Sequence, residues 1–177
     1  MPRLRLKLPD LDLLDEYFSY DSELGEIRLK KDFAKGKAGD LAGYVNDIGY
    51  RQIYFKGKTY FAHRIAWKLH YRVEPEFDID HEDQVRSNIK INNLRKANFA
   101  QNNWNRKLTA RNTTGIKGVG WSKHLNKWRV VIYCNYRCNF IGNFADFDEA
   151  CRRADAARII FHGEFAHNGI YAIGRAA

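Results

Sequence analysis

Two adjacent residues, Asp80 and His81, place a carboxylate beside an imidazole. A carboxylate is a ligand for a hard divalent cation, and a neutral imidazole can take a proton from an attacking water. Amide side chains follow the pair closely enough to supply further oxygen ligands. They are Asn88, Asn92, Asn93, Asn98, Asn102, Asn103 and Asn105. These residue types are the ones that metal-assisted hydrolysis of a phosphodiester needs.

The pair stands at the edge of a long segment without acidic residues. No Asp or Glu occurs from Gln84 to Phe144, whereas twelve Lys and Arg lie between Arg86 and Arg137. The chain of 177 residues has a formal net charge of +9. Excess cation gives sequence-independent affinity for a phosphate backbone, so the composition favours a nucleic-acid partner. A basic surface that only aids solubility is the alternative.

Short strands and helices must position the pair. Residues 77–81 are extended in character, so neighbouring side chains point to opposite faces. The two residues can therefore serve one site only near the strand's end or at a bend. Before them, residues 49–61 have the pattern of a β-hairpin and residues 62–71 predict a short helix. After a polar loop, residues 91–95 lead into a helix-like stretch that reaches Asn105.

The second half of the chain has a different pattern. Three strands are predicted at residues 117–121, 127–133 and 137–142, followed by a helix at 147–161 with Asp146 or Asp148 as its N-cap. Small polar and basic residues at 107–114 predict a linker between the halves.

The central strand of the second half has one apolar and one polar face. Trp128, Val130 and Ile132 alternate with Lys127, Arg129 and Tyr133. A sheet with such a polar face can enter a major groove, where cations meet phosphates and guanine acceptors. Lys117, Ser122, Lys123 and His124 are expected to extend the same surface. A solvated charged face and an RNA-binding module are the alternatives.

Three short motifs in the first half resemble the HNH endonuclease family, in particular its homing branch from phages and mobile introns. They are Asp80-His81, Asn93-Leu94-Arg95 and Gln101-Asn102-Asn103-Trp104-Asn105. The resemblance implies a ββα-metal fold. It also implies that His81 is the general base, Asp80 and Asn102 are metal ligands, and Asn93 holds the loop and orients the base.

The surroundings of these motifs bear on the same resemblance. Residues 62–67 and the hairpin before them look like what precedes the motif in this branch, with Arg64 as a phosphate contact and His63 expected mainly in the core. The loop departs from the family pattern, because Gln84-Val85 and Asn88-Ile89 stand where relatives often have Gly-Asp and Asp-Asn.

The second half resembles the apetala/ethylene-response-factor DNA-binding domain. The matching motifs are Gly115-Ile116-Lys117-Gly118-Val119, Lys127-Trp128, Ile141-Gly142-Asn143-Phe144, Glu149-Ala150, Ala154-Asp155-Ala156-Ala157 and Gly163-Glu164-Phe165-Ala166. The resemblance implies DNA contacts from Lys117, Ser122, His124, Arg129, Tyr133 and Phe140. Gly120, Ser122 and Cys138 replace the usual arginines, so no relative's sequence preference can be transferred.

The predicted fold class is α+β: an HNH nuclease module preceded by β-hairpins, then a three-stranded antiparallel sheet packed on one helix. The expected domains are residues 1–106 with the motif at 78–105, a basic linker at 107–114, the DNA-binding domain at 115–168 and a tail at 169–177. The predicted function is homing-type cleavage of duplex DNA. A non-catalytic DNA-binding regulator is the alternative. The expected DNA contacts are Arg64, Arg95, Arg106, Lys107, Lys117, Ser122, Lys123, His124, Lys127, Arg129, Tyr133, Arg137 and Phe140.

The remaining expectations concern cofactor, assembly and location. Magnesium is the expected metal, with manganese as the alternative, and no structural zinc is expected because Cys134, Cys138 and Cys151 lack a second close pair. The N-terminus is too rich in charge for a signal peptide, and no run approaches a membrane span. A cytoplasmic monomer is expected, with a dimer left open.

Overall fold

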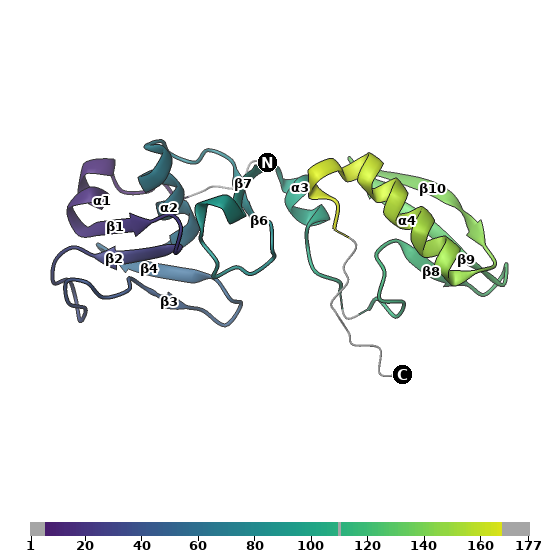
Figure 1. Cartoon of the computed structure of the whole chain (residues 1–177), viewed down its shortest axis with the longest axis horizontal. Helices are drawn as coiled ribbons and strands as arrows, with labels where there is room; N and C mark the ends of the chain where they lie inside the picture. The colour runs from purple at the N-terminus through teal and green to yellow at the C-terminus, as the bar shows by residue number, and fades with distance from the viewer. Residues whose placement is uncertain (1–5, 110, 168–177) are drawn as a thin grey trace. The chain divides into compact units, whose positions relative to one another are not determined.

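The computed structural model describes residues 6–109 and 111–167, and the fold class α+β is confirmed (Figure 1). By internal contacts the chain divides into two compact units, Met1–Ala97 and Asn98–Ala177. Each unit combines helices with small antiparallel sheets. The predicted tail at 169–177 lies outside the described residues.

The first unit is built from short elements around one apolar core. In chain order they are α1 (Leu11–Tyr17), β1 (Phe18–Asp21), β2 (Glu26–Leu29), β3 (Tyr44–Val45), β4 (Arg51–Phe55), β5 (Lys58–Phe61), α2 (Ala62–Tyr71), β6 (Asp78–His81), the 3-10 turn η1 (Ile91–Asn93) and β7 (Leu94–Ala97). Strand β1 pairs with β2, β3 with β4, β4 with β5, and β6 with β7. Leu14, Phe18, Phe55 and Ile65 are fully buried in the core.

The predicted hairpin and helix before the motif are confirmed. Strands β4 and β5 are joined by Lys56 and Gly57, both at positive φ (45° and 80°), as a two-residue turn requires. Helix α2 follows directly and buries most of its side chains, so it forms the centre of the core rather than a surface helix.

A buried ion-pair network fixes the segment that leads from α2 into β6. The carboxylate of Glu74 accepts hydrogen bonds from Lys68 Nζ (2.8 Å) and Arg64 Nη2 (3.2 Å) on α2. It also accepts one from the backbone N–H of Leu8 (3.1 Å). Because both cations are largely buried, removing their shared partner would leave uncompensated charge, which costs about 3–5 kcal/mol in buried pairs. The network therefore holds the start of β6 against the core.

The ββα-metal fold that the resemblance implies has a second strand between β6 and the helix, and the predicted lead-in at residues 91–95 runs into this strand. Residues Leu94–Ala97 form β7, which pairs antiparallel with β6. The strand is favoured because Leu94 and Ala97 are buried while the backbone completes the ladder of β6. The helix starts only at Phe99, where Asn98 and Gln101 form a reciprocal capping box.

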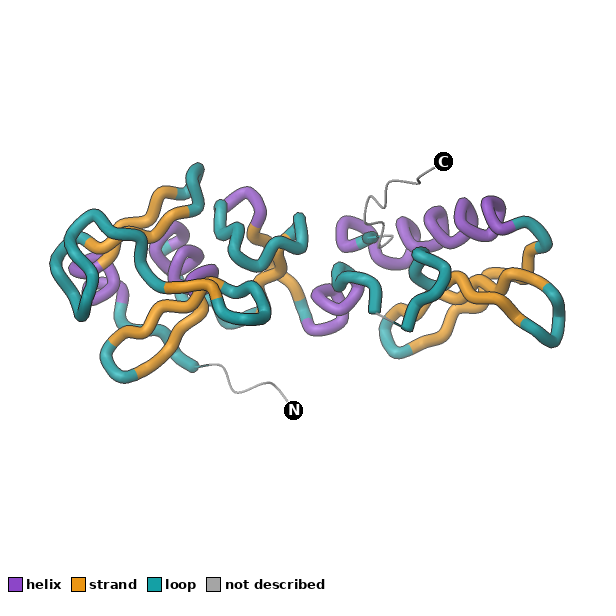
Figure 2. Tube along the Cα trace, turned by 90° about the horizontal axis from the view of Figure 1, so that it is seen from below, coloured by secondary structure: helices purple, strands orange, loops and turns teal. Residues whose placement is uncertain are grey.

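The second unit consists of α3 (Phe99–Trp104), β8 (Val119–Ser122), β9 (Lys127–Cys134), β10 (Arg137–Phe144), α4 (Phe147–His162) and the 3-10 turn η2 (Gly163–Phe165). The sheet has the order β10-β9-β8, and all pairs are antiparallel. Figure 2 shows α4 lying along one face of this sheet. Val119 and Val130 pack there against Ala150 and Ala154 of the helix.

The predicted three strands and helix of this half are confirmed, and Asp146 is the N-cap, accepting from the backbone N–H of Glu149 (2.7 Å). The even positions of β9 are the more buried ones, as the alternation predicted. The boundary between the two compact units lies after Ala97, whereas the linker was predicted at residues 107–114. The difference arises because α3 packs within the second unit. Across the described ranges, no helix is long and apolar enough to cross a membrane.

Candidate active site

The β6–β7 hairpin carries the Asp80-His81 pair at the end of its first strand. Asp80 lies opposite Arg95 and His81 opposite Leu94. Both polar side chains are buried, with 4% and 5% of their surface exposed. Because β6 ends at His81, the pair occupies the strand end that the sequence argument required for a shared site.

The carboxylate of Asp80 is held by a neighbouring guanidinium. Arg95 Nε donates to Asp80 Oδ2 (3.0 Å), and its Nη2 lies 2.9 Å from the same oxygen. The second side of the guanidinium reaches the exposed Glu82, with Nη1 donating to Oε1 at 3.1 Å. Arg95 therefore fixes the orientation of the carboxylate across the hairpin.

The imidazole of His81 is packed against other rings. It meets the ring of His63 edge to face at a centroid distance of 4.9 Å, and that of Tyr50 at 6.0 Å. Burial lowers the pKa of His81 to about 4. The positive charge of Arg86 also lowers this pKa, whereas the negative charge of Asp83 raises it. The imidazole is thus neutral at physiological pH and its ring is held in place.

His63, which was expected mainly in the core, also contacts the imidazole of His81. It is buried at the start of α2, and its Nδ1 has no hydrogen-bond partner. Its ring also stacks on Phe61 at 5.4 Å. The sequence signal for this position was the motif-like segment at 62–67, but the contact between the two imidazoles depends on how α2 packs against β6.

The loop from Glu82 to Lys90 is tied to Asn93. The side-chain oxygen of Asn93 accepts from the backbone N–H of Asp83 (3.0 Å). Its amide donates to Asp83 Oδ1 (2.9 Å) and to the carbonyl of Asn88 (2.9 Å). Asn88 in turn donates to Asp83 Oδ2 (2.7 Å). The loop that follows the base is therefore closed by side-chain hydrogen bonds.

Asp83 was not singled out from the sequence, although its carboxylate joins Asn88 and Asn93. Its Oδ1 also accepts from the backbone N–H of Val85 (2.8 Å), a local turn typical of Asp. Gln84 adopts a positive φ of 62°. That is a backbone conformation that glycine adopts most easily, which gives a physical reason for glycine at this place in relatives.

The segment that contains these residues matches a known family. The family model for HNH endonuclease matches residues 60–103. Protein 3.8 of Escherichia phage T7 is 32% identical over 120 residues, which cover 66% of this chain and 94% of that protein. The chain belongs to the HNH endonuclease family. A solved structure of DNA binding and cleavage by the HNH homing endonuclease I-HmuI covers 91% of this chain and 93% of that chain, at 19% identity and a TM-score of 0.41.

All four predicted central positions of the HNH motif fall inside the matched segment: Asp80, His81, Asn93 and Asn102. The first three lie on the β6–β7 hairpin and the turn before β7. Asn102 lies on α3, in the second compact unit. Its role as a metal ligand stays a prediction.

Asp80 offers the HNH motif an oxygen ligand of the kind that hard divalent cations prefer. Magnesium is commonly held by one or two carboxylates, with waters and substrate phosphates completing its shell, and Asp80 supplies one buried carboxylate. In residues 6–109 and 111–167, no group of three or more His, Cys, Asp or Glu side chains could hold a metal ion. The cysteines are free, and Cys134 Sγ donates to the carbonyl of Phe161 (3.2 Å).

Several cations predicted to contact DNA have partners within the protein, among them Arg106, whose Nη1 donates to Asn103 Oδ1 (3.3 Å). Arg64 donates to Glu74 and the carbonyl of Pro75 (both 3.2 Å), and Arg95 binds Asp80 and Glu82. Lys117 Nζ donates to the carbonyl of Trp104 (2.8 Å) and is half-buried. The expectation that Lys117 extends the DNA-facing surface of the sheet is therefore not met, because its side chain points to Trp104.

Arg106 and the other predicted DNA contacts are exposed or partly exposed. Arg106 and Lys107 follow α3, and Ser122 ends β8. Lys123, His124, Lys127, Arg129, Tyr133, Arg137 and Phe140 are exposed on the sheet and its turns. The guanidinium of Arg129 lies 5.7 Å from the ring centre of Phe140. These side chains give the sheet a cationic and aromatic outer face.

Proposed function

We propose that this protein is a metal-dependent DNA endonuclease of the homing type, which hydrolyses phosphodiester bonds of duplex DNA. One observation carries the proposal: the segment that matches the HNH endonuclease family folds into a hairpin that buries Asp80 and His81 side by side and ties the following loop to Asn93. With one motif per chain, a monomer cuts one strand at a time.

His81 acts as the general base in this proposal. Its ring is held by His63 and Tyr50, so its orientation toward an attacking water is fixed by packing. Asn93 keeps the loop after the base closed through Asp83 and Asn88. Orientation of this kind contributes to catalysis because it removes the entropy cost of aligning the reacting groups.

Asp80 and Asn102 would hold the divalent metal, magnesium or manganese. When bound, the metal neutralises charge on the phosphate and assists the leaving oxygen. With a single carboxylate and an amide as ligands, the site stays less negative for an incoming phosphate than a site with two carboxylates. Arg95 orients the carboxylate of Asp80 by its hydrogen bond to Oδ2.

Metal dependence can be measured on supercoiled plasmid that carries candidate sites. We expect nicked or linear product with magnesium or manganese, no product after EDTA is added, and recovery when magnesium is restored in excess. Cutting that continues in EDTA would contradict the proposed use of a metal.

A non-catalytic DNA-binding regulator is the second candidate function. The observation in its favour is that the carboxylate of Asp80 is already paired with Arg95 inside the protein. This reading predicts that the chain binds DNA but gives no product with any divalent metal. The plasmid measurement separates the two candidates.

The second unit is proposed to place the nuclease on DNA through an apetala/ethylene-response-factor-like domain at residues 115–168. Its sheet presents Lys127, Arg129 and Tyr133 on the face opposite α4. Such a face offers cations for phosphates and guanine, and aromatic rings for thymine methyl groups.

Replacing Arg129 with alanine tests this surface. We expect DNA affinity to fall about 10-fold and the slope of log affinity against log salt to shrink by about one, because one cation at the interface is lost. Arg152→Ala is the matched control, since it removes the same charge from an exposed position on α4. Equal losses in the two variants, measured by fluorescence anisotropy over a salt series, would show an effect of net charge rather than of the sheet face.

A further inference from the structure

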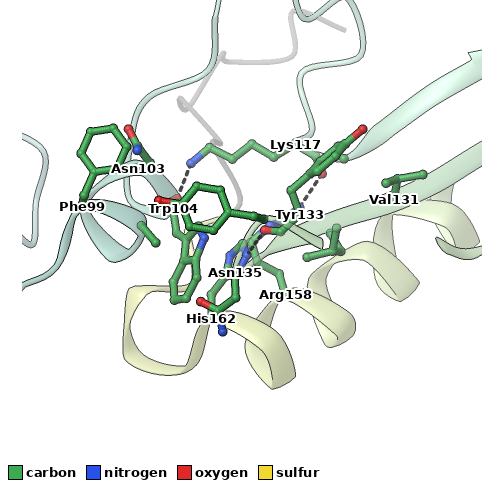
Figure 3. A pocket seen from close by; sticks show the side chains of 13 residues that line it. Phe99, Asn103, Trp104, Lys117, Val131, Tyr133, Asn135, Arg158 and His162 are labelled. Atoms are coloured by element: carbon green, nitrogen blue, oxygen red, sulfur yellow. Dashed lines mark hydrogen bonds between the residues drawn. The ribbon is translucent and has the colours of Figure 1, made fainter. Parts of the chain in front are cut away.

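A hollow of about 400 Å³ lies in the second unit, beside the C-terminal part of the central strand β9 (Figure 3). Its walls come from Phe99 and Trp104 on α3, His162 at the end of α4, Tyr133 on β9 and Tyr136 in the turn after β9. No acidic residue lines it. The lining is therefore aromatic and cationic, and no part of the proposed active site uses it.

One wall of the hollow is held rigidly by stacked rings. The indole of Trp104 and the imidazole of His162 lie 4.5 Å apart and almost parallel, at 5°. The imidazole Nε2 is 2.9 Å from the carbonyl oxygen of Tyr133 and donates to it. The hollow is thus a preformed feature of the packing between α3, α4 and β9.

Two cations stand in the same lining. Arg158 is buried and donates to Asp155 Oδ1 (2.6 Å) and to the carbonyl of Lys117 (2.5 Å). Lys117 Nζ donates to the carbonyl of Trp104. Burial lowers the pKa of Lys117 to about 8, and the charges of Arg158 and Arg106 contribute to this shift. At neutral pH Lys117 is still mostly protonated, whereas the charge of Arg158 is balanced by its ion pair with Asp155. The charge of Lys117 therefore favours a ligand that carries phosphate.

The rim of the hollow carries a tyrosine that the fold does not require. Asn135 and Tyr136 form the two-residue turn between β9 and β10, with φ of 49° and 62°. Such turns favour Asn-Gly, because a side chain at the second position is strained. The side chain of Tyr136 is 93% exposed, so it buries little surface that could offset this strain. The ring of Tyr136 is therefore available to a ligand at the rim of the hollow.

The hollow adjoins the sheet face that is proposed to bind DNA. Tyr133, which is 67% exposed, lines it and also lines a second depression on the sheet together with Ser122 and Arg129. A base displaced from DNA on that face would have a short path into the hollow.

We propose that the hollow takes one unstacked nucleobase of the DNA held on the adjacent sheet face. This inference rests on the proposed function. The aromatic rings offer stacking surfaces, the side-chain amides of Asn103 and Asn135 can hydrogen-bond the edge of a base, and Lys117 supplies a positive charge for its phosphate. Enzymes that take a base out of the stack read it with the same combination of stacking and edge contacts.

The test compares two labelled duplexes that differ only by one unpaired thymidine in the middle. Binding of the full chain is measured by fluorescence anisotropy in EDTA, so that no cleavage occurs. We expect the bulged duplex to bind about 10-fold more tightly, as stacking of a base on an aromatic side chain predicts. In Tyr136→Gly the ratio of the two affinities is expected to fall to about one, because the ring that stacks on the base is gone.

Glycine suits the turn, so this variant is expected to fold at least as well as the wild type. The control is Tyr54→Ala, which removes an exposed tyrosine of the first unit and should keep the ratio. Free thymidine monophosphate carries the same base and phosphate, so at millimolar concentration it is expected to lower the ratio by competing with the unpaired base for the hollow.

Two outcomes overturn the inference and leave the proposed function standing: equal affinity of the wild type for both duplexes, or an unchanged ratio in Tyr136→Gly. Failure to bind either duplex is a different result, because it removes the proposed function together with the inference.

Discussion

Replacing Asp80 with asparagine is expected to lower the rate of DNA cleavage by about 10²–10³-fold, since a catalytic metal contributes several kcal/mol. The amide oxygen can still accept the hydrogen bond that Arg95 donates to Oδ2 at 3.0 Å. The hairpin is therefore expected to stay folded while the negative charge is lost. The rate is measured by plasmid nicking with enzyme in excess, and circular dichroism checks the fold.

Glu82→Gln is the matched control for Asp80→Asn. Glu82 pairs with the same guanidinium at 3.1 Å, but its side chain is 54% exposed. Exposed pairs contribute little, so cleavage in this variant should stay within about 2-fold of the wild type. Similar losses in both variants would mean that the charge balance of Arg95, rather than a metal ligand, governs the rate.

His81→Ala is expected to lower cleavage by about 10²–10⁴-fold, the range that general-base catalysis contributes. The imidazole is buried against His63 and Tyr50, so no other side chain of this cluster takes its position when it is removed. DNA affinity should be unchanged, because the cationic sheet face lies in the other unit. Parallel measurements of single-turnover rate and of affinity separate the two effects.

His70→Ala provides the comparison for this variant. His70 is an exposed histidine on α2, so its removal changes the histidine content without opening the buried cluster. Cleavage at the wild-type rate is expected. A loss in His70→Ala as large as that in His81→Ala would argue that the buried histidine acts through stability alone.

Elements with a strong local pattern were predictable from the sequence. The alternation of Trp128, Val130 and Ile132 determined the buried face of β9, and the Lys56-Gly57 turn determined the hairpin. The resemblance to a ββα-metal fold implied a second strand, but the bounds of β7 were not predicted, because Leu94–Ala97 is too short for periodicity and becomes a strand only by pairing with β6. The start of α3 has a local signal in the sequence, the capping box of Asn98 and Gln101, and this signal was overlooked.

The roles of the candidate site residues stay predictions, and the connections between these residues could not be predicted from the sequence. The motif located Asp80, His81 and Asn93, whereas the role of Asp83 in the loop depends on three-dimensional closure. Long cationic side chains were the least predictable. Lys117 has the spacing of a surface residue, yet its Nζ binds the carbonyl of Trp104, because the loop before β8 packs on α3.

His81 of the HNH motif is proposed to be the base for metal-dependent DNA cleavage. The most direct measurement incubates supercoiled plasmid carrying candidate sites with magnesium and either the wild type or His81→Ala, and follows binding in the same samples. We expect both proteins to bind the plasmid and only the wild type to nick or linearise it. Equal cutting by the two proteins would contradict the role of His81, and binding without cutting by the wild type over a range of metals would contradict the nuclease itself.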